Sequence, residues 1–187
     1  MKPIDIINEF YAPGTKAHEI LLRHSEAVAE KALRLAEKIP DLKPDTRFIE
    51  ESAMLHDIGI FYTNSPSIGC NGKYPYVCHG YLGRKLMEDR GYHRHALVCE
   101  RHVGAGLSID DINKFNLPLP KRDMVPVSLE EQIVCYADKF YSKKLDQRIE
   151  ELSIKAVVEK IESYGPEQAL RLRGWVDLFE TNGQNEI

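Results

Sequence analysis

The sequence predicts a single all-α domain of seven to nine helices. Apolar residues recur at steps of three and four along most of the chain, which is the spacing of one helix face. Strict alternation of apolar and polar residues never extends beyond about four positions, so strands are disfavoured. The 187 residues contain no repeat and no linker, and they fit one domain, 1–187, at roughly 100–200 residues per domain.

The clearest predicted helix lies between Thr15 and Pro40. One face of it consists of Leu21, His24, Val28, Ala32, Leu35 and Ile39. Thr15 is expected to cap the first turn, and Pro40 is expected to end the helix because proline has no N–H to donate. A second helix is predicted from Asp45 as its cap to about Ile58, with Gly59 as its end.

Glycine and proline mark the middle of the chain. Residues 61–76 are rich in Gly, Pro, Ser, Asn and Tyr and predict a long ordered loop, which in a compact domain is often a binding loop. Two helices are predicted after it, at about 78–89 and 93–103, with Gly91 between them.

Capping residues mark the helices of the last third. Ser108 and Asp111 predict the capping box of a short helix, and residues 116–126 form a proline-rich connection. Ser128 predicts the start of a helix that runs to about Leu145. The last two helices are expected to start after Ser153 and at Pro166, with Gly165 between them.

The composition excludes several classes of protein. Hydrophobic residues make up 43% and charged residues 29%, which excludes collagen, coiled coil and long disorder as the main structure. No apolar run approaches the roughly 18 residues of a membrane span, so no membrane partner is expected. A net charge of −4 argues against duplex nucleic acid as a partner. The four cysteines form no CxxC pair, which favours a cytoplasmic protein.

Six side chains that can bind metal lie on core-facing positions of the predicted helices. They are His24, His56, Asp57, His79, His102 and Asp138. His56 and Asp57 are adjacent where the chain must turn, so both can approach one point. An ionised aspartate on an apolar stripe, such as Asp138, is costly unless it is paired or binds a metal. A lone inward histidine is more often a core residue, but six such groups together predict a site for a metal of intermediate softness.

These residues, in this order, resemble the HD-domain superfamily of metal-dependent phosphohydrolases, in its HDIG subgroup. The resemblance is carried by LLRHS at His24, AMLHDIG at His56 and Asp57, and YADKF at Asp138, and it covers about residues 20–145. The family fold is all-α, as the periodicity predicts. Helices within residues 152–180 are then expected to pack on this core.

The resemblance implies a dinuclear site. The first metal would be held by His24, His56, Asp57 and Asp138, and the second by Asp57, His79 and His102. Asp57 would bridge the two ions, which makes it the predicted catalytic residue. The expected cofactors are two divalent transition metal ions, iron first, with manganese, nickel and zinc as alternatives. A metal-bridging hydroxide would attack a small phosphate monoester or diester, such as a nucleotide.

A phosphate-bearing substrate also requires cations near the metals. Lys73 and Arg84 are the predicted substrate-binding residues, because the loop and the helix of His79 border the expected site. Ile60 stands where enzymes that cleave cyclic dinucleotides carry a lysine, so that substrate class is disfavoured. The segment from His79 to Asp138 is more similar to small bacterial and archaeal HDIG proteins, including the diadenosine-tetraphosphate hydrolase branch.

Two alternatives stay open. The same six ligands hold the mixed-valent di-iron centre of HD-fold oxygenases, and a metal-stabilised binding module without turnover is the other alternative. Hydrolysis is favoured because it is the commoner chemistry of the fold. The sequence leaves the substrate, the native metal and the oligomeric state open.

Overall fold

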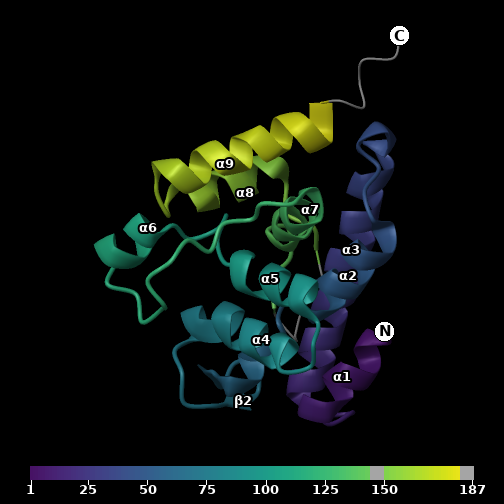
Figure 1. The fold of residues 1–187 in the computed structure, drawn as a ribbon, viewed down its shortest axis with the longest axis vertical. Coiled ribbons are helices and arrows are strands. Elements are labelled where there is room, and N and C mark those ends of the chain that lie inside the picture. Colours follow the sequence, from purple (N-terminus) through teal and green to yellow (C-terminus); the bar gives the residue numbers. More distant parts are fainter. Residues whose placement is uncertain (144–149, 182–187) are drawn as a thin grey trace.

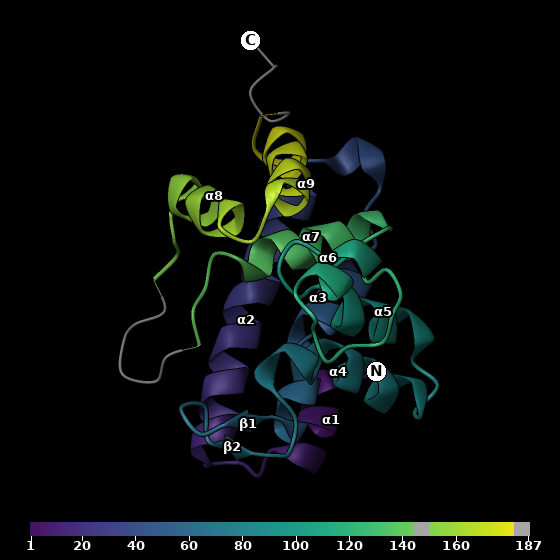
Figure 2. The same cartoon turned by 90° about the vertical axis from the view of Figure 1, so that its left-hand side faces the viewer.

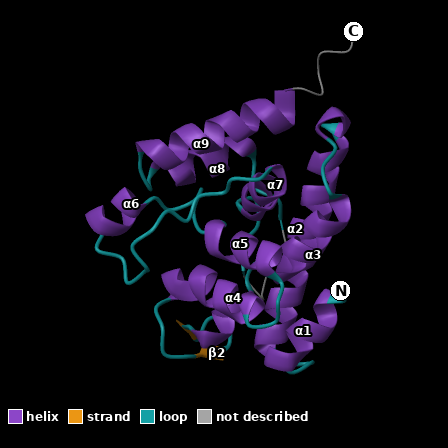
Figure 3. Ribbon diagram, in the orientation of Figure 1, coloured by secondary structure: helices purple, strands orange, loops and turns teal. Residues whose placement is uncertain are grey.

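The computed structural model describes residues 1–143 and 150–181, and nearly all of its regular structure is helical (Figures 1 and 3). Within these ranges it has nine α-helices, so the all-α prediction is confirmed. In chain order they are α1 Pro3–Phe10, α2 Lys16–Glu37, α3 Thr46–Leu55, α4 His79–Glu88, α5 His93–Arg101, α6 Ile109–Lys114, α7 Leu129–Asp138, α8 Ile154–Glu162 and α9 Pro166–Val176.

The predicted caps are present at most helix starts. Thr15 accepts a hydrogen bond from the backbone N–H of His18 at the start of α2, and Asp45 does the same for Phe48 in α3. Ser108 and Asp111 form a complete capping box at α6. The helix α1 was not predicted, because Lys2 before it makes no side-chain cap and only a proline at its first position marks its start.

Two predicted helices end earlier in the structure than the sequence suggested. Helix α3 ends at Leu55, and a 3₁₀ helix of Ile58–Tyr62 follows in place of a further α-helical turn. A Cβ on Gly59 would lie 2.1 Å from the carbonyl oxygen of His79, so only glycine allows the chain to turn so close to α4. Helix α7 ends at Asp138, whereas its predicted end near residue 145 lies outside the described residues.

The predicted loop at 61–76 contains a small hairpin. Strand β1 (Asn64–Ser65) pairs with β2 (Cys70–Asn71) in antiparallel register, with Ser65 opposite Cys70. Another 3₁₀ helix, Tyr76–Cys78, leads directly into α4. The loop is therefore ordered, as predicted, but it is not without regular structure.

The long helix α2 runs along one side of the molecule and packs against α3 and α7 (Figures 1 and 2). Helices α8 and α9 lie across one end of the molecule next to α7, α4 and α5 lie side by side, and α1 and the hairpin occupy the opposite end. A large apolar core joins α2, α3 and α7 to the last two helices, to which α8 contributes Val157 and Ile161 and α9 contributes Leu172 and Trp175. None of the helices in the described ranges has both the length and the apolar character needed to cross a bilayer.

Candidate metal centre

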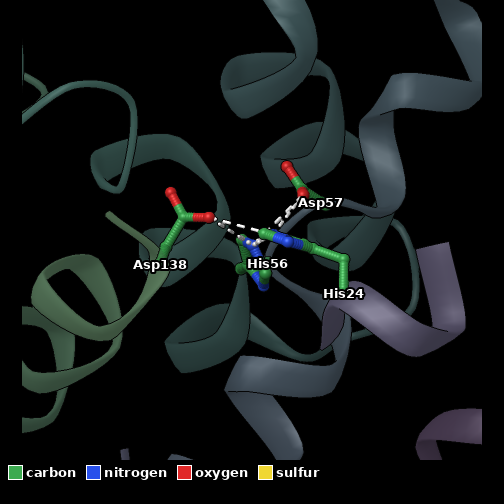
Figure 4. Close-up of side chains that lie close together, drawn as sticks. All are labelled: His24, His56, Asp57 and Asp138. Atoms are coloured by element: carbon green, nitrogen blue, oxygen red, sulfur yellow. Dashed lines mark hydrogen bonds and ion pairs between the residues drawn. The ribbon is translucent and has the colours of Figure 1, made fainter. Parts of the chain in front are cut away.

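Two groups of buried histidines and aspartates meet in the interior and share one residue. The first group is His24, His56, Asp57 and Asp138 (Figure 4), and the second is Asp57, His79 and His102. Within each group, one potential ligand atom per residue lies within 4.8 Å of all the others. The structure thus brings together the six residues predicted to bind metal.

Helix ends supply most of these side chains. His24 comes from the middle of α2, where its neighbours Leu21 and Val28 are buried on the same face. The other five are His56 and Asp57 just after α3, His79 at the first position of α4, His102 just after α5 and Asp138 at the last position of α7. Five separate elements can converge because the chain is free to turn at each helix end.

Asp57 presents a different oxygen to each group. Its Oδ2 lies 3.3 Å from Nε2 of His24 and 3.1 Å from Nε2 of His56. Its Oδ1 lies 3.4 Å from Nε2 of His79 and 3.3 Å from Nε2 of His102. Neither oxygen has a hydrogen-bond partner of regular geometry among the described residues. One carboxylate placed in this way can bind two cations at once, one through each oxygen.

The contacts inside each group are equally short. Nε2 of His24 lies 2.9 Å from Oδ1 of Asp138 and 3.3 Å from Nε2 of His56. In the second group, the Nε2 atoms of His79 and His102 are 3.0 Å apart. Distances of this size bring nitrogen and oxygen ligand atoms close enough to share one ion.

Backbone carbonyls fix the tautomers of three of the histidines. In each, Nδ1 donates to the carbonyl oxygen three residues earlier, at 2.6 Å for His56, 2.6 Å for His79 and 2.7 Å for His102. A carbonyl can only accept, so the proton is on Nδ1 and the neutral ring keeps a lone pair on Nε2. Two such lone pairs that face each other repel unless a cation lies between them. The arrangement therefore fits a metal ion.

Burial and charge set the protonation of the site. Burial lowers the pKa of His79 to about 3 and also lowers the pKa of His102, which keeps both rings neutral as metal ligands must be. Burial alone would also lower the pKa of His56, but the carboxylates of Asp57 and Asp138 together outweigh burial and raise that pKa to about 9. Without a metal, Nε2 of His56 thus carries a second proton at neutral pH, and a metal ion must displace this proton to use the lone pair.

The two carboxyl groups stay ionised although they are buried. Burial raises the pKa of a carboxyl group, but the positive charges of His56 and Lys143 hold the pKa of Asp57 well below its usual value. For Asp138 the same result comes from Lys139 and Lys143. Buried carboxylates that stay ionised are what a site for a divalent cation requires, and in the absence of an ion the neighbouring cations balance their charge.

A cavity of about 490 Å³ opens beside the second group. Its cationic lining consists of Lys139, Lys143 and Lys160, close to Asp138. The rest of its wall is largely apolar or aromatic and includes Val77, Val103, Leu107, Ile161 and Tyr164. A pocket of this size with a few charged groups at one end suits a small anionic molecule.

The predicted substrate-binding residues do not line this cavity. Lys73 borders a separate cavity together with Tyr62 and Tyr74 of the hairpin region. The guanidinium of Arg84 pairs with Glu88 at 2.8 Å and with the buried carboxylate of Glu100. Proximity in sequence to the motif led to both choices, but the hairpin directs Lys73 elsewhere and two carboxylates occupy Arg84.

Sequence reasoning missed Lys143 and Lys160 at the cavity. Lys143 follows Asp138 by five residues and comes from a non-helical segment, so no helical spacing connects the two. Lys160 lies on α8, outside the region of the motifs. Lys139 could be identified from the sequence as a residue near the site, because it is next to Asp138 in the YADKF motif.

The HD domain family model matches residues 21–142, which include all six residues of the two groups. The chain therefore belongs to the HD domain family. It is 32% identical to an uncharacterized protein of Methanocaldococcus jannaschii over 68% of this chain and 71% of that protein. No solved structure shows significant similarity to this chain.

Two further relatives are longer proteins. Proteins named tRNA (cytidine(56)-2'-O)-methyltransferase from Picrophilus torridus and Thermoplasma volcanium are 31% and 29% identical over 84% and 82% of this chain. The chain spans only 40% and 39% of their lengths. It is thus similar to about two fifths of each of these methyltransferases.

Proposed function

We propose that this protein is a metal-dependent phosphohydrolase of the HDIG type that holds two divalent transition metal ions and acts on a small phosphate ester such as a nucleotide. Asp57 carries the proposal, because each of its oxygens faces a separate pair of histidines. Two ions at such a site supply Lewis acidity and lower the pKa of water, which phosphate-ester hydrolysis requires. Iron is the first choice of metal, with manganese, nickel and zinc as alternatives.

The remaining residues of the site have supporting roles. Lys139 holds the Asp138 carboxylate in place, since its Nζ lies 2.6 Å from Oδ2 and also donates to the carbonyl oxygen of His102 at 2.8 Å. The lysines of the cavity attract a phosphate group. The apolar wall excludes water, which strengthens these charge interactions.

The names of the relatives bear on the substrate. Methyl transfer is the named reaction of proteins of which this chain spans two fifths, so it is not proposed for this chain. Their named substrate is a tRNA, which favours a nucleotide or the phosphorylated end of an RNA strand as the phosphate ester. A small-molecule nucleotide is the first expectation, because the cavity is small.

Product release from a panel of phosphate esters tests the proposal. The protein is loaded anaerobically with iron(II) or manganese(II) and offered nucleotides, dinucleoside polyphosphates, sugar phosphates and an RNA strand with a terminal phosphate. We expect release of phosphate or nucleotide from at least one of these classes, lost in Asp57→Asn and retained in the control Asp89→Asn, whose aspartate is exposed at the end of α4.

Two outcomes would contradict the proposal. Hydrolysis that survives in Asp57→Asn would place the activity outside the two groups. Absence of release from the metal-loaded protein, combined with consumption of oxygen in the presence of iron, would favour the di-iron oxygenase that shares the ligand set.

A further inference from the structure

A lysine from outside the family motifs reaches into the first group. The Nζ of Lys143 lies 2.8 Å from Oδ2 of Asp57 and 3.6 Å from Oδ1 of Asp138. These are the same two oxygens that face His24 and His56. An ammonium group therefore occupies the side of the carboxylates that the first group would offer to a metal.

We propose that Lys143 neutralises Asp57 and Asp138 when no metal is bound, competes with the metal of the first group, and binds the phosphoryl group of the substrate once that metal is in place. The last part rests on the proposed function. The first two parts concern only this chain and a metal ion.

Electrostatic repulsion explains why a metal ion would replace Lys143 at the two carboxylates. The carboxylates of Asp57 and Asp138 are buried in one cluster and need positive charge beside them, and the ammonium of Lys143 lies 2.8 Å from one and 3.6 Å from the other. A divalent cation bound to the same oxygens would repel that ammonium across a short distance in a poorly screened interior. Metal binding must therefore displace the Lys143 side chain.

The cavity beside the second group has room for the displaced side chain of Lys143. Lys143 lines it together with Lys160 and Tyr76, and its own side chain is 14% exposed. It comes from the segment after α7, not from a helix. The Tyr76 phenol lines the same cavity as Lys143, so its hydroxyl can donate a hydrogen bond to the same phosphate.

Lys139, in contrast to Lys143, is held in place by an acceptor that a metal would not bind. Its ammonium has two acceptors, Oδ2 of Asp138 and the carbonyl oxygen of His102, and the second of these is not a metal-facing atom. Both ion pairs that the described residues give Lys143 are with carboxylates of the cluster, and its further hydrogen-bond partner is the Tyr76 hydroxyl, which lines the cavity. Lys143 is therefore the one of the two that a metal would release.

Binding measurements on Lys143→Gln and Lys143→Arg test the inference without substrate turnover. Calorimetry gives the affinity of each chain for manganese(II), and then the affinity of the manganese-loaded chain for inorganic phosphate. We expect Lys143→Gln to bind manganese about tenfold more tightly and phosphate about tenfold more weakly, the factor of one charge-assisted hydrogen bond. Lys143→Arg should keep the wild-type phosphate affinity, and Lys155→Gln, which removes a lysine 85% exposed on α8, should change neither affinity.

The results separate this inference from the proposed function. Unchanged or weaker manganese binding in Lys143→Gln would overturn the competition, and unchanged phosphate binding would overturn the phosphoryl contact. If both affinities shift in opposite directions but no phosphate ester is hydrolysed, the inference holds and the proposed function fails. Circular dichroism on each variant verifies that the chain is folded.

Discussion

The two buried regions of this molecule are stabilised in opposite ways. Under α8 and α9, the side chains of Leu172, Trp175 and Phe179 are packed against α2 and α7, and the apolar burial that holds them depends little on ions or pH. A short distance away, the histidines and aspartates of the metal groups are just as buried, but lone pairs and charges face one another. The first region maintains the fold, whereas the second could hold metal ions.

The largest effect is expected from a change in the polar region. Replacing Asp57 by Asn keeps the volume but removes the charge that both groups share, so metal retention should be lost and turnover should fall by roughly 10³-fold or more. Metal analysis and initial rates measure the two effects together. Loss of turnover with full metal content would show that Asp57 does not link the two ions.

The next largest effect is expected from the apolar region, where a substitution should lower stability without changing metal binding. Phe179 is fully buried, and its ring centroid lies 5.4 Å from that of Tyr136. Truncation in Phe179→Ala should lower the free energy of unfolding by about 3–5 kcal/mol and leave the metal content per folded chain unchanged. Urea unfolding measures it, with Leu170→Ala at a 69% exposed position as the matched control. A variant that loses metal while folded would mean that the two regions are coupled.

Removal of metal should act on the polar region alone. A ligand that binds only the folded state at 100 times its dissociation constant adds about 2.7 kcal/mol of stability. A chelator should therefore lower the melting temperature of the wild-type protein by several degrees, and it should have no effect on Asp57→Asn. An equal drop in both proteins would assign the effect to something other than metal at this site.

The smallest expected effect is the pH dependence of the metal-free protein. Because the pKa of His79 falls from 6.5 to about 3 on folding, the unfolded chain binds more protons in this window, and stability is lost as the pH drops below 6.5. The pKa of His56 rises to about 9, so its contribution has the opposite sign and is lost as the pH rises from 6.5 towards 9. Each should change stability by about 1 kcal/mol over the first pH unit from 6.5.

Thermal unfolding of chelated protein between pH 5.5 and 7.5 checks this. The expected profile has its maximum near pH 6.5 and is flatter on the acid side in His79→Gln. A monotonic profile would mean that one of the two histidines does not have the environment described above.

The sequence predicted the two groups of histidines and aspartates better than the lining of the cavity beside them. His24 could be placed because it lies on a regular apolar stripe, and His56 and Asp57 because adjacent metal-binding residues precede a glycine turn. Lys143 could not be placed, since its position depends on how the chain leaves α7. Lys73 and Arg84 were chosen by their distance along the chain, but the hairpin and Glu100 determine where those two charges lie.

The number of metal ions bound per chain decides whether the six residues hold two ions. The protein is equilibrated anaerobically with iron(II) or manganese(II), freed of loosely bound ions, and analysed for metal per chain. We predict two ions in the wild-type protein and one in the double variant His79→Ala/His102→Ala, which keeps the first group intact. A single ion in the wild-type protein, or an unchanged content in the double variant, would contradict the assignment of two ions to these six residues.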